Sequence, residues 1–439
     1  MSVNPRGPVT PQKIAEAAKQ FGSPFYLYDE QTISDRCAAI SQMPNAYGLH
    51  VAYAMKANAN RALLRLITSR GLDLDCSTLN EVRRAHLAGI PYDKMMLTSQ
   101  EVPENKDRED LEAMILKGLA YNVCSIRQLE MITDFAVRNK LSLSMRVNPG
   151  KGTGESRSRN TGDNYSSFGI HLTHMDKVTQ WIRKHKLHIR QVHTHIGSGG
   201  DPLAWRENIN RLLEIIEQYF PDAETANLGG GFKVARMPDE EPADINDLGH
   251  YAKDKFQAFY ERTGRKLLMG IEPGTFIMAN AGYLVSQVMD KKYSGPDGFE
   301  FIILNAGMES NSRPLLYGSR HPYYVISQKG QLLYSDFALH DTDNENDLRV
   351  ICGRCCESGD SQSIDIYGHV TPRMLVDPEL DDYFVIGGTG AYCSAMSLIN
   401  YNSNLQIPEV ILKKDGSFQL IRRRQSMEQM IQNEMDVEE

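Results

Sequence analysis

A single lysine, Lys56, closes a short apolar run at residues 51–56 that has the composition of a buried strand. Lysine is seldom buried without a partner or a chemical role. A desolvated lysine amine has a lowered pKa and can form a Schiff base with a carbonyl cofactor such as pyridoxal phosphate. Most lysines at strand ends simply point into water, so this segment alone leaves both interpretations open.

Three consecutive glycines and one glutamate offer groups that the same cofactor needs. Gly229, Gly230 and Gly231 follow an apolar run, and consecutive glycines let backbone N–H groups approach an anion; a tight turn is the plainer interpretation. Glu272 opens the segment Glu-Pro-Gly-Thr, in which Gly274 could add a further N–H. A carboxylate beside a pyridine nitrogen favours the protonated ring, which makes pyridoxal phosphate an electron sink. An ordinary strand-end carboxylate is the alternative.

Histidines and cysteines raise the question of a metal site. His193 and His195 share one face of an extended strand, but no third and fourth ligand follows at a suitable spacing. Stacking of one imidazole on a flat cofactor ring fits better. Cys352 and Cys355 form a Cys-x-x-Cys pair, but the second pair of a structural zinc site is missing. We therefore predict no metal and interpret residues 352–360 as a loop that carries a thiol and carboxylates toward an active site.

Composition limits the class of protein. The chain has 439 residues, which predicts two domains, and its 41% hydrophobic and 24% charged residues are ordinary for a globular protein. The net charge of -8 argues against a nucleic-acid partner. No apolar run approaches the roughly 18 residues of a membrane span, and no signal-peptide core is visible, so we expect a cytoplasmic protein with no membrane partner. The seven scattered cysteines suit free thiols.

The first two-thirds of the chain alternates short apolar runs with longer amphipathic stretches such as 126–138 and 205–219. The apolar runs read as strands at 51–56, 72–76, 95–99, 120–124, 143–148, 192–197, 225–230 and 267–274. Strands that alternate with helices indicate a parallel sheet. Eight of them predict a closed (β/α)8 barrel, and an open doubly wound sheet is the alternative.

The pattern changes after residue 281. Turn-rich segments there join strand-like runs at 299–304, 323–327 and 383–386. This predicts a mostly antiparallel β domain, with which the early apolar run 25–28 is expected to pair. The predicted fold is thus α/β plus β, with an eight-stranded parallel barrel at 34–281 and a β domain with short helices formed by 1–33 and 282–439. Residues 151–165, rich in Gly, Ser, Asn and Arg, are expected to form a loop over the barrel mouth.

In a barrel of this kind, functional residues gather where strands end and loops begin. The candidate residues meet this demand, because each lies at or just after the C-terminal end of an expected strand. They are Lys56, Asp75, Arg146, Asn148, His195, Gly229, Gly230, Gly231 and Glu272. Agreement across several strands indicates one shared site more strongly than any residue does alone.

The order of these segments along nearly the whole chain resembles a known family. Its signature pieces are residues 53–58 (Tyr-Ala-Met-Lys-Ala-Asn), 168–170 (Phe-Gly-Ile), 195–198 (His-Ile-Gly-Ser), 229–231 (Gly-Gly-Gly), 272–274 (Glu-Pro-Gly), 313–317 (Arg-Pro-Leu-Leu-Tyr), 356–360 (Cys-Glu-Ser-Gly-Asp) and 390–392 (Gly-Ala-Tyr). The chain resembles the alanine-racemase-like, fold type III pyridoxal-phosphate decarboxylases, and within them the members that decarboxylate diaminopimelate. The resemblance implies pyridoxal 5'-phosphate as cofactor and decarboxylation of the small amino acid meso-2,6-diaminopimelate to L-lysine, in lysine biosynthesis.

The resemblance also implies roles around the cofactor. Lys56 would hold it covalently, His195 would stack on the pyridine ring, and Glu272 would pair with the ring nitrogen. Ser198, Gly231, the turn at 272–275 and Tyr392 would surround the phosphate. The full set expected to bind the cofactor is Lys56, Asp75, His195, Ser198, Gly229, Gly230, Gly231, Glu272, Gly274 and Tyr392.

Members of this family form head-to-tail homodimers with shared active sites. By the resemblance, Cys356 and Glu357 would reach the cofactor of the partner subunit, with Cys356 as the proton donor to the decarboxylated carbanion. Arg313, Tyr317 and Glu357 would hold the far end of the substrate, and Tyr392 would lie beside it.

Three positions depart from the family pattern. Thr275 stands where the family has arginine after Glu-Pro-Gly, Ser167 where it has lysine before Phe-Gly, and Arg354 where it has proline before the Cys-Glu-Ser loop. Arg354 is a hypothetical substitute for the charge lost at 275. Thr275 keeps open a decarboxylase that acts on lysine, ornithine or carboxynorspermidine. A non-catalytic homologue is a further alternative, against which Lys56 and Cys356 argue.

Overall fold

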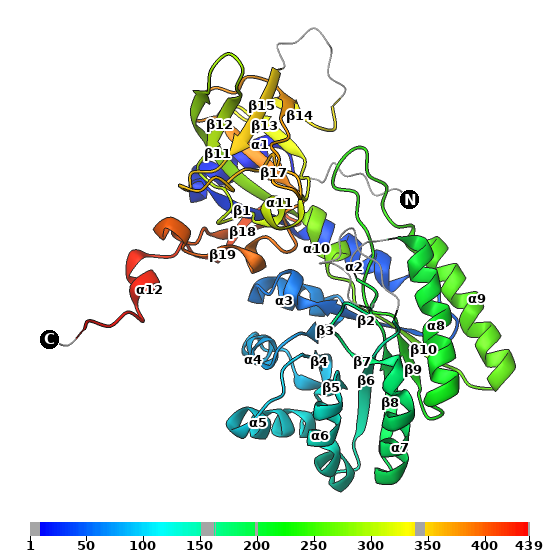
Figure 1. The fold of residues 1–439 in the computed structure, drawn as a ribbon. Coiled ribbons are helices and arrows are strands. Elements are labelled where there is room, and N and C mark those ends of the chain that lie inside the picture. The colour runs from blue at the N-terminus through cyan, green and yellow to red at the C-terminus, as the bar shows by residue number, and fades with distance from the viewer. Residues whose placement is uncertain (1–8, 151–161, 163, 198–200, 339–346, 438–439) are drawn as a thin grey trace. The chain divides into compact units, whose positions relative to one another are not determined.

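The computed structural model describes residues 9–150, 162, 164–197, 201–338 and 347–437 (Figure 1). The chain divides into two compact units, each built on its own sheet. The barrel unit comprises Ser34–Val234 and Glu241–Ile277. The β unit comprises Met1–Ile33, Ala235–Glu240 and Met278–Glu439.

Eight parallel strands form the barrel unit's sheet. They are β2 (Leu49–Ala54), β3 (Asp73–Cys76), β4 (Met95–Thr98), β5 (Ala120–Val123), β6 (Ser142–Asn148), β8 (His188–His193), β9 (Thr225–Asn227) and β10 (Leu268–Ile271). The sheet closes because β10 pairs with β2 and β9, while β5 pairs with both β4 and β6. A short strand, β7 (Ile170–His171), extends the end of β6. The predicted barrel is confirmed, and the open doubly wound sheet is excluded.

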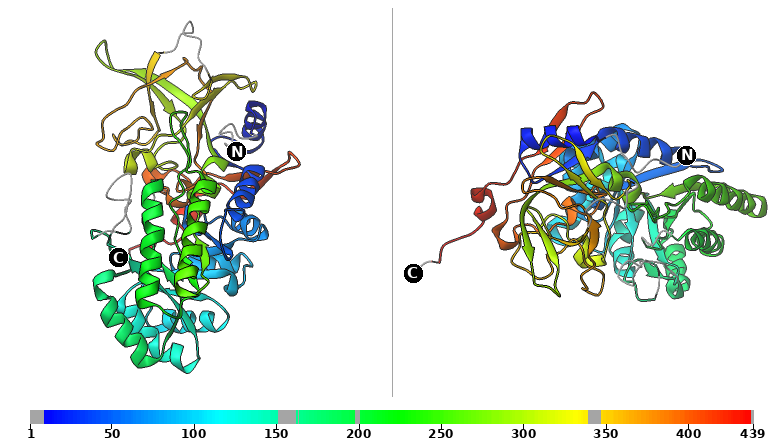
Figure 2. Two further views of the ribbon diagram at one scale, coloured as in Figure 1. Left: turned by 90° about the vertical axis from the view of Figure 1, so that its right-hand side faces the viewer. Right: turned by 90° about the horizontal axis from the view of Figure 1, so that it is seen from above.

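Helices surround the barrel in the order expected for (β/α)8 topology (Figure 1). They are α2 (Glu30–Ser41), α3 (Arg61–Ser69), α4 (Leu79–Leu87), α5 (Asn105–Leu116), α6 (Ile126–Arg138), α7 (Met175–His185), α8 (Pro202–Tyr219) and α9 (Ile245–Thr263), followed by the single turn α10 (Thr275–Met278). Helix α6 shows why such segments are helical: Ser125 caps its first turn, and Leu129, Ile132 and Phe135 recur at helical spacing on the buried face. Helices α8 and α9 run side by side (Figure 2).

The β unit contains a branched sheet. Its strands are β1 (Phe25–Asp29), β11 (Gly282–Tyr293), β12 (Glu300–Leu304), β13 (Tyr323–Ile326), β14 (Leu332–Ser335), β15 (Asp347–Cys352), β16 (Arg373–Leu375), β17 (Tyr383–Gly387), β18 (Glu409–Leu412) and β19 (Phe418–Arg422). Strand β1 pairs antiparallel with β11 and parallel with β18, which confirms that the early run joins this sheet. Apart from β1–β18 and β12–β15, the pairings between these described strands are antiparallel.

Three short helices accompany this sheet: α1 (Pro11–Phe21), α11 (Arg313–Tyr317) and α12 (Met427–Ile431). The core is made by inward residues of several strands, among them Phe25, Leu27, Val285, Val385 and Val410. These residues come from β1, β11, β17 and β18, so burial of one shared apolar face holds segments that are far apart in sequence.

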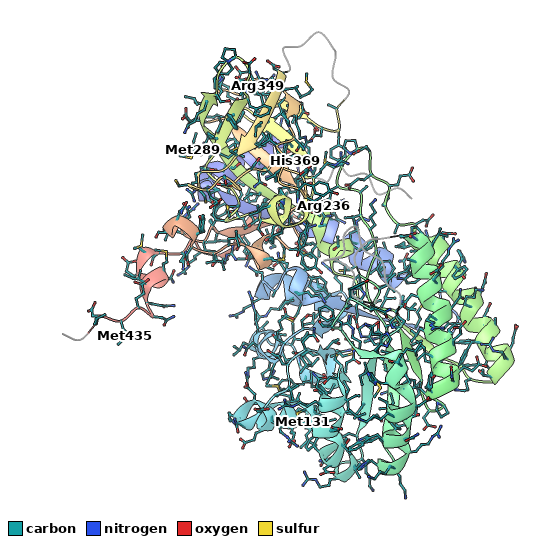
Figure 3. The ribbon with its side chains drawn as sticks, viewed as in Figure 1. Met131, Arg236, Met289, Arg349, His369 and Met435 are labelled. Carbon is teal, nitrogen blue, oxygen red and sulfur yellow. The ribbon has the colours of Figure 1, made fainter. Side chains whose placement is uncertain are left out.

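A short piece from the middle of the chain also belongs to the β unit. Arg236 Nε donates to the Gly388 carbonyl at 3.1 Å, and the side chain is labelled in Figure 3. Asp239 accepts from Arg320 Nη2 at 2.7 Å. Nothing in the hydrophobic pattern marks this excursion, because polar contacts hold it along with one buried apolar side chain, Met237.

Several predicted strands are longer than the observed ones. Strands β2, β9 and β10 end at Ala54, Asn227 and Ile271, whereas the predicted runs continued to residues 56, 230 and 274. Local backbone chemistry ends them: a 3-10 turn follows β2, a glycine with positive φ follows β9, and a proline follows β10. Most of the predicted loop 151–165 lies outside the described residues. No helix in the described part of the chain combines the length and apolar character needed to cross a membrane.

Candidate active site

The C-terminal ends of the barrel strands bring the predicted residues of the barrel unit together, as this topology requires. Ala54 of β2 pairs with Asp75 of β3, so Lys56 follows β2 at the level where Asp75 sits. Asn227 ends β9, and the paired strand β10 leads directly into Glu272. Parallel pairing therefore concentrates an amine, two carboxylates and an amide at one end of the barrel.

Glu272 is a buried carboxylate with a side-chain nitrogen close to each of its two oxygens. Its side chain is 6% exposed, Asn227 Nδ2 donates to Oε1 at 2.8 Å, and His193 Nε2 lies 3.3 Å from Oε2. Burial alone would raise the pKa of Glu272, but its interaction with His193, together with the positive charge of Lys56, outweighs burial and holds the pKa below its usual range. Glu272 is therefore ionised at neutral pH.

Asp75 has the opposite tendency in the same site. It is 2% exposed, and its Oδ1 has no hydrogen-bond partner within the described residues. Burial first, and then repulsion from Glu272, raise the pKa of Asp75; Lys56 and a hydrogen bond with Thr98 oppose them. Two carboxylates whose pKa values are pushed apart are typical of sites where the place of a proton matters.

Lys56 does not lie within β2, contrary to the sequence-based expectation. It occupies the 3-10 turn Met55–Ala57, and its side chain is exposed although both neighbours are buried. The strand ends two residues earlier than its apolar composition suggested. The Lys56 ammonium nevertheless acts on Asp75, Glu81 and Glu272, lowering the pKa of each carboxyl, so it lies among the acidic groups of the site.

His195 is held as a neutral ring. Its Nδ1 accepts a hydrogen bond from the Gly230 amide at 3.2 Å, which assigns the ring proton to Nε2. Burial, followed by the positive charges of Arg146 and Lys56, lowers the pKa of His195 well below its usual value. A neutral imidazole in this position suits stacking on a flat ring.

The glycine triplet is shaped around His195. Gly229 has φ +68°, and a Cβ there would lie 2.7 Å from His195 Nδ1, so glycine is required for this close approach. The Gly229 amide donates to Asn227 Oδ1 at 2.9 Å, and the Gly230 amide donates to His195. These two N–H groups are therefore used inside the barrel unit, and a contact of the triplet with an anion rests on Gly231.

Two further residues predicted to contact the phosphate are Ser198 and Gly274. Ser198 lies outside the described residues. Gly274 is buried. The carbonyl of the preceding residue, Pro273, accepts from the Ala54 amide at 3.3 Å, and helix α10 begins at the following residue, Thr275.

Arg146 is a strong candidate that motif reasoning did not assign to the cofactor. It is a buried residue of β6, its guanidinium lies 4.9 Å from the centre of the Phe168 ring, and its Nη2 has no hydrogen-bond partner in the described chain. Its strand-end position was the available signal. The orphaned nitrogen of Arg146 can donate to an anionic group and the orphaned oxygen of Asp75 can accept from a donor, so this end of the barrel fits a molecule that carries both, such as pyridoxal phosphate.

Residues predicted for the substrate form a second cluster, in the β unit. The Arg313 guanidinium lies 5.7 Å from the ring centre of Tyr317 and 5.9 Å from that of Tyr392. Its Nη2 donates to Ser319 Oγ at 3.2 Å, and its buried Nε has no hydrogen-bond partner among described residues. Tyr392 has φ +58°, a strained conformation for a non-glycine residue that is frequent at ligand sites.

The Cys356 loop belongs to the same unit and presents its side chains outward. Both Cys356 and Glu357 are exposed. The Cys356 amide donates to Asn402 Oδ1 at 2.7 Å, and the Tyr401 hydroxyl donates to Glu357 Oε2 at 3.2 Å. The Gly359 amide is the main cause of a lowered pKa of Glu357, so this carboxylate stays ionised.

A buried cluster of two acids and one thiol includes two residues of that loop. Ligand atoms of Glu309, Cys355 and Asp360 lie within 4.8 Å of one another, a spacing that could hold a metal. Asp360, however, accepts from the amides of Met308 at 2.6 Å and Cys355 at 2.7 Å, and Arg354 Nε lies 3.5 Å from Glu309 Oε1. Burial raises the pKa of both Glu309 and Asp360, backbone donors and a guanidinium oppose it only in part, and the charge of Arg354 is directed toward Glu309.

Comparison with known proteins gives consistent matches over the whole chain. Residues 31–279 match the family described as pyridoxal-dependent decarboxylase, pyridoxal binding domain. Diaminopimelate decarboxylase of Escherichia coli strain K12 is 31% identical over 431 residues, covering 97% of each chain. Diaminopimelate decarboxylase of Streptomyces coelicolor is 29% identical and covers 97% of this chain and 92% of its own.

Solved structures agree with these matches. A crystal structure of diaminopimelate decarboxylase superimposes with a TM-score of 0.85 at 29% identity and covers 98% of each chain. The Helicobacter pylori enzyme of the same name, complexed with L-lysine, has a TM-score of 0.80 at 26% identity and covers 95% of this chain and 98% of its own.

Proposed function

The chain belongs to the pyridoxal-dependent decarboxylases, and from that premise we propose that it converts meso-2,6-diaminopimelate to L-lysine and carbon dioxide. The observation that carries the proposal is Glu272, which is buried and ionised among His193, Asn227 and Lys56. A carboxylate held in this state is what keeps a neighbouring pyridine nitrogen protonated. Relatives named for this substrate align over 97% of the chain, which supports the choice of amino acid.

Pyridoxal phosphate, when bound, supplies the electron sink that stabilises the carbanion left by departing carbon dioxide. Lys56 would provide the amine that anchors the cofactor, and it must first lose a proton. Asp75 is the proposed acceptor, because burial raises the pKa of its carboxyl and Lys56 interacts with it electrostatically. Neutral His195 would stack on the ring without adding positive charge.

The phosphate contacts are part of the same proposal. Gly231, Gly274 and Ser198 would supply donors from the barrel, and Tyr392 would supply its hydroxyl. The support is geometric for the glycines, since Gly231 has φ +100° and a Cβ there would lie 3.1 Å from the Gly197 carbonyl. That crowding leaves little room for a side chain between the backbone and an anion.

We further propose a homodimer in which each active site uses both subunits. Apart from Tyr392, the cofactor residues lie in the barrel unit, whereas Arg313, Tyr317, Cys356 and Glu357 lie in the β unit. A two-fold symmetric dimer would supply the second group from the partner at both sites at once. Arg313 would hold the distal carboxylate, and Cys356 would return a proton to the carbanion.

Thr275 favours a second candidate substrate class. The conversion of meso-diaminopimelate to L-lysine preserves the L centre, so the carboxylate that leaves is on the D centre. Thr275 is neutral where the family resemblance leads us to expect arginine, and Arg354 Nε lies 3.5 Å from Glu309 Oε1. If no cation grips the distal carboxylate, the same chemistry would act on diamino acids without one, such as the D forms of lysine and ornithine.

A single panel tests both candidates. Carbon dioxide release is measured from meso-diaminopimelate and from both enantiomers of lysine and ornithine, with the cofactor-loaded enzyme. A higher kcat/KM for meso-diaminopimelate supports the proposal, and a higher value for a D-diamino acid supports the second candidate. No release from any of the five would overturn both.

We also propose a cytoplasmic location. Each of the seven cysteines lies in the described part of the chain and carries a free thiol. Disulfides are rare in reducing compartments, so this usage fits the cytoplasm. Fractionation of the native host would test the assignment.

A further inference from the structure

His193 lies in the middle of a chain of polar side chains that crosses the C-terminal end of the barrel. On one side, Asn122 Nδ2 donates to Thr98 Oγ1 at 3.1 Å and approaches His193 Nδ1 at 2.8 Å. On the other side, His193 Nε2 lies 3.3 Å from Glu272 Oε2, at ion-pair distance but outside hydrogen-bond geometry, and Asn227 Nδ2 donates to Oε1 at 2.8 Å. The chain thus links side chains at the ends of β4, β5, β8, β9 and β10.

The position of the imidazole proton follows from these contacts. His193 is 1% exposed, and burial is the main cause of its lowered pKa, so the ring is neutral and carries one N–H. Because the Asn122 amide nitrogen is a donor, His193 Nδ1 must accept. The ring proton is therefore on Nε2, the atom that faces Glu272.

Other roles for this histidine fit the structure less well. A metal on His193 would need Nδ1 or Nε2, and these face an amide donor and Glu272, with no further His, Cys, Asp or Glu cluster of ligand spacing around it in the described chain. Stacking on a cofactor is better served by His195, which follows the end of β8 and accepts from the Gly230 amide. His193 is instead wedged between Asn122 and the carboxylate.

We propose that His193 is a positioning residue, whose Nε2 proton holds Oε2 of Glu272 so that the carboxylate stays ionised and correctly oriented. The inference rests on the proposed function, in which Glu272 pairs with the ring nitrogen of the cofactor. Asn227 donates to one oxygen of Glu272 and Nε2 of His193 faces the other, so in the proposal the two together set the plane of the carboxylate. Asn122, held by Thr98, in turn selects the histidine tautomer.

Nuclear magnetic resonance of histidine-labelled holoenzyme tests the tautomer directly. The chain has 12 histidines, and the His193 signals are assigned by their loss in His193→Gln. The expected pattern at pH 8 is a protonated Nε2 and an unprotonated Nδ1. A proton on Nδ1, or an imidazolium, would overturn the proposal. The same spectrum of cofactor-free protein shows whether the tautomer is set by the chain itself, as the contacts require.

Kinetics test the positioning role. His193→Leu removes the donor and should lower kcat by about tenfold, with KM changed by less than about threefold, because a charged buried group loses its partner. The acid limb of the pH profile of kcat should move to higher pH, since Glu272 becomes easier to protonate. His193→Gln restores an N–H donor and should recover most of kcat. His50→Gln, which alters a partly buried pair with Asp73 outside the site, is the matched control.

Two further measurements keep the outcomes distinct. Thermal unfolding of each variant separates a loss of fold from a loss of positioning. A Leu variant with normal unfolding and normal kcat would overturn the proposal. A Gln variant that folds but recovers none of the lost kcat would overturn it as well. If the substrate assignment fails, cofactor binding still decides the matter. The visible absorption of the bound cofactor should shift with pH in His193→Leu and stay near that of the unmodified enzyme in His193→Gln.

Discussion

The carboxylates of Asp75 and Glu272 act on each other inside one buried site and have opposite pKa shifts. Burial raises the pKa of Asp75, and the negative charge of Glu272 raises it further. Burial also opposes ionisation of Glu272, but its interaction with His193 and the positive charge of Lys56 reverse the balance. One carboxylate is thereby kept charged and the other made basic, which divides the site into a fixed anion and a proton acceptor.

This relationship predicts how stability depends on pH in the cofactor-free protein. The folded pKa of Asp75 is raised above its unfolded value, so between these two values the folded state binds more protons, and stability falls as pH rises through this window. Asp75→Asn removes the cost of the buried charge. We expect its melting temperature to exceed that of the unmodified protein by a few degrees at pH 8 and the difference to shrink as pH falls toward 4. A difference that grows on acidification would contradict the assignment.

Glu272→Gln keeps the size of the side chain but removes its charge. We expect kcat to fall by roughly a hundredfold, the scale typical of losing a preorganised electrostatic group. The substitution should also lower the pKa of Asp75, because a repulsive neighbour is gone. The double variant with Asp75→Asn should then show non-additive effects on melting temperature, as expected for groups in one network. Strict additivity would mean that the two carboxylates do not interact.

Much of the architecture was predictable, because it follows from hydrophobic patterning. The apolar runs of β2 to β10 and the Ser125 cap of α6 are local signals, and the (β/α)8 topology then sends the strand ends to one side. The predicted end of β2 was two residues too late, because the apolar composition of the strand continues into the 3-10 turn that contains Lys56. Composition reports burial, and it does not report where hydrogen-bonded pairing stops.

The contacts within the site were less predictable. Asn122 and Asn227 look like ordinary polar interruptions of apolar runs, and their importance comes from what lies across the barrel. The amides of Gly229 and Gly230 were expected to face an anion, but local backbone conformation turns them toward Asn227 and His195. Such details depend on strand pairing and on φ angles, which a single sequence does not encode in its periodicity.

Lys56 is expected to be the covalent attachment point of the cofactor. Borohydride treatment of the yellow holoenzyme should fix the cofactor to the peptide that contains Lys56, because the Lys56 amine interacts with Asp75, the proposed acceptor of its proton. Lys56→Ala should lose the visible absorption band and all activity. Lys94→Ala, which alters a partly exposed lysine paired with Asp73, serves as a control. Labelling at another lysine would contradict the assignment.

Subunit mixing is expected to show that each site is shared. Lys56→Ala and Cys356→Ala subunits are each inactive in the proposal, but a mixed dimer has one site with both intact residues. Random exchange should therefore restore about a quarter of the sites of the unmodified enzyme, from two-fold symmetry. Exchange is verified with affinity tags of two kinds. No recovery in proven mixed dimers would mean that one chain builds the whole site.

Substrate choice is expected to depend on Arg313. Its guanidinium is buried between Tyr317 and Tyr392 and can grip a distal carboxylate with two hydrogen bonds, whereas a distal ammonium would meet a like charge. Losing such a partner typically costs about 2–5 kcal/mol. Arg313→Ala should therefore lower kcat/KM for meso-diaminopimelate by more than tenfold while that for D-lysine changes less.

Thr275→Arg is the companion test of the same selectivity. If a cation is wanted near the distal carboxylate, this change should leave kcat/KM for meso-diaminopimelate similar or higher and should lower it for a diamino acid, because the added charge repels the distal ammonium. Thr275→Gln controls for the size of the side chain. A D-diamino acid preferred by the unmodified enzyme, with preference moved to meso-diaminopimelate by Thr275→Arg, would identify residue 275 as the determinant of specificity and remove the distal-carboxylate role from Arg313.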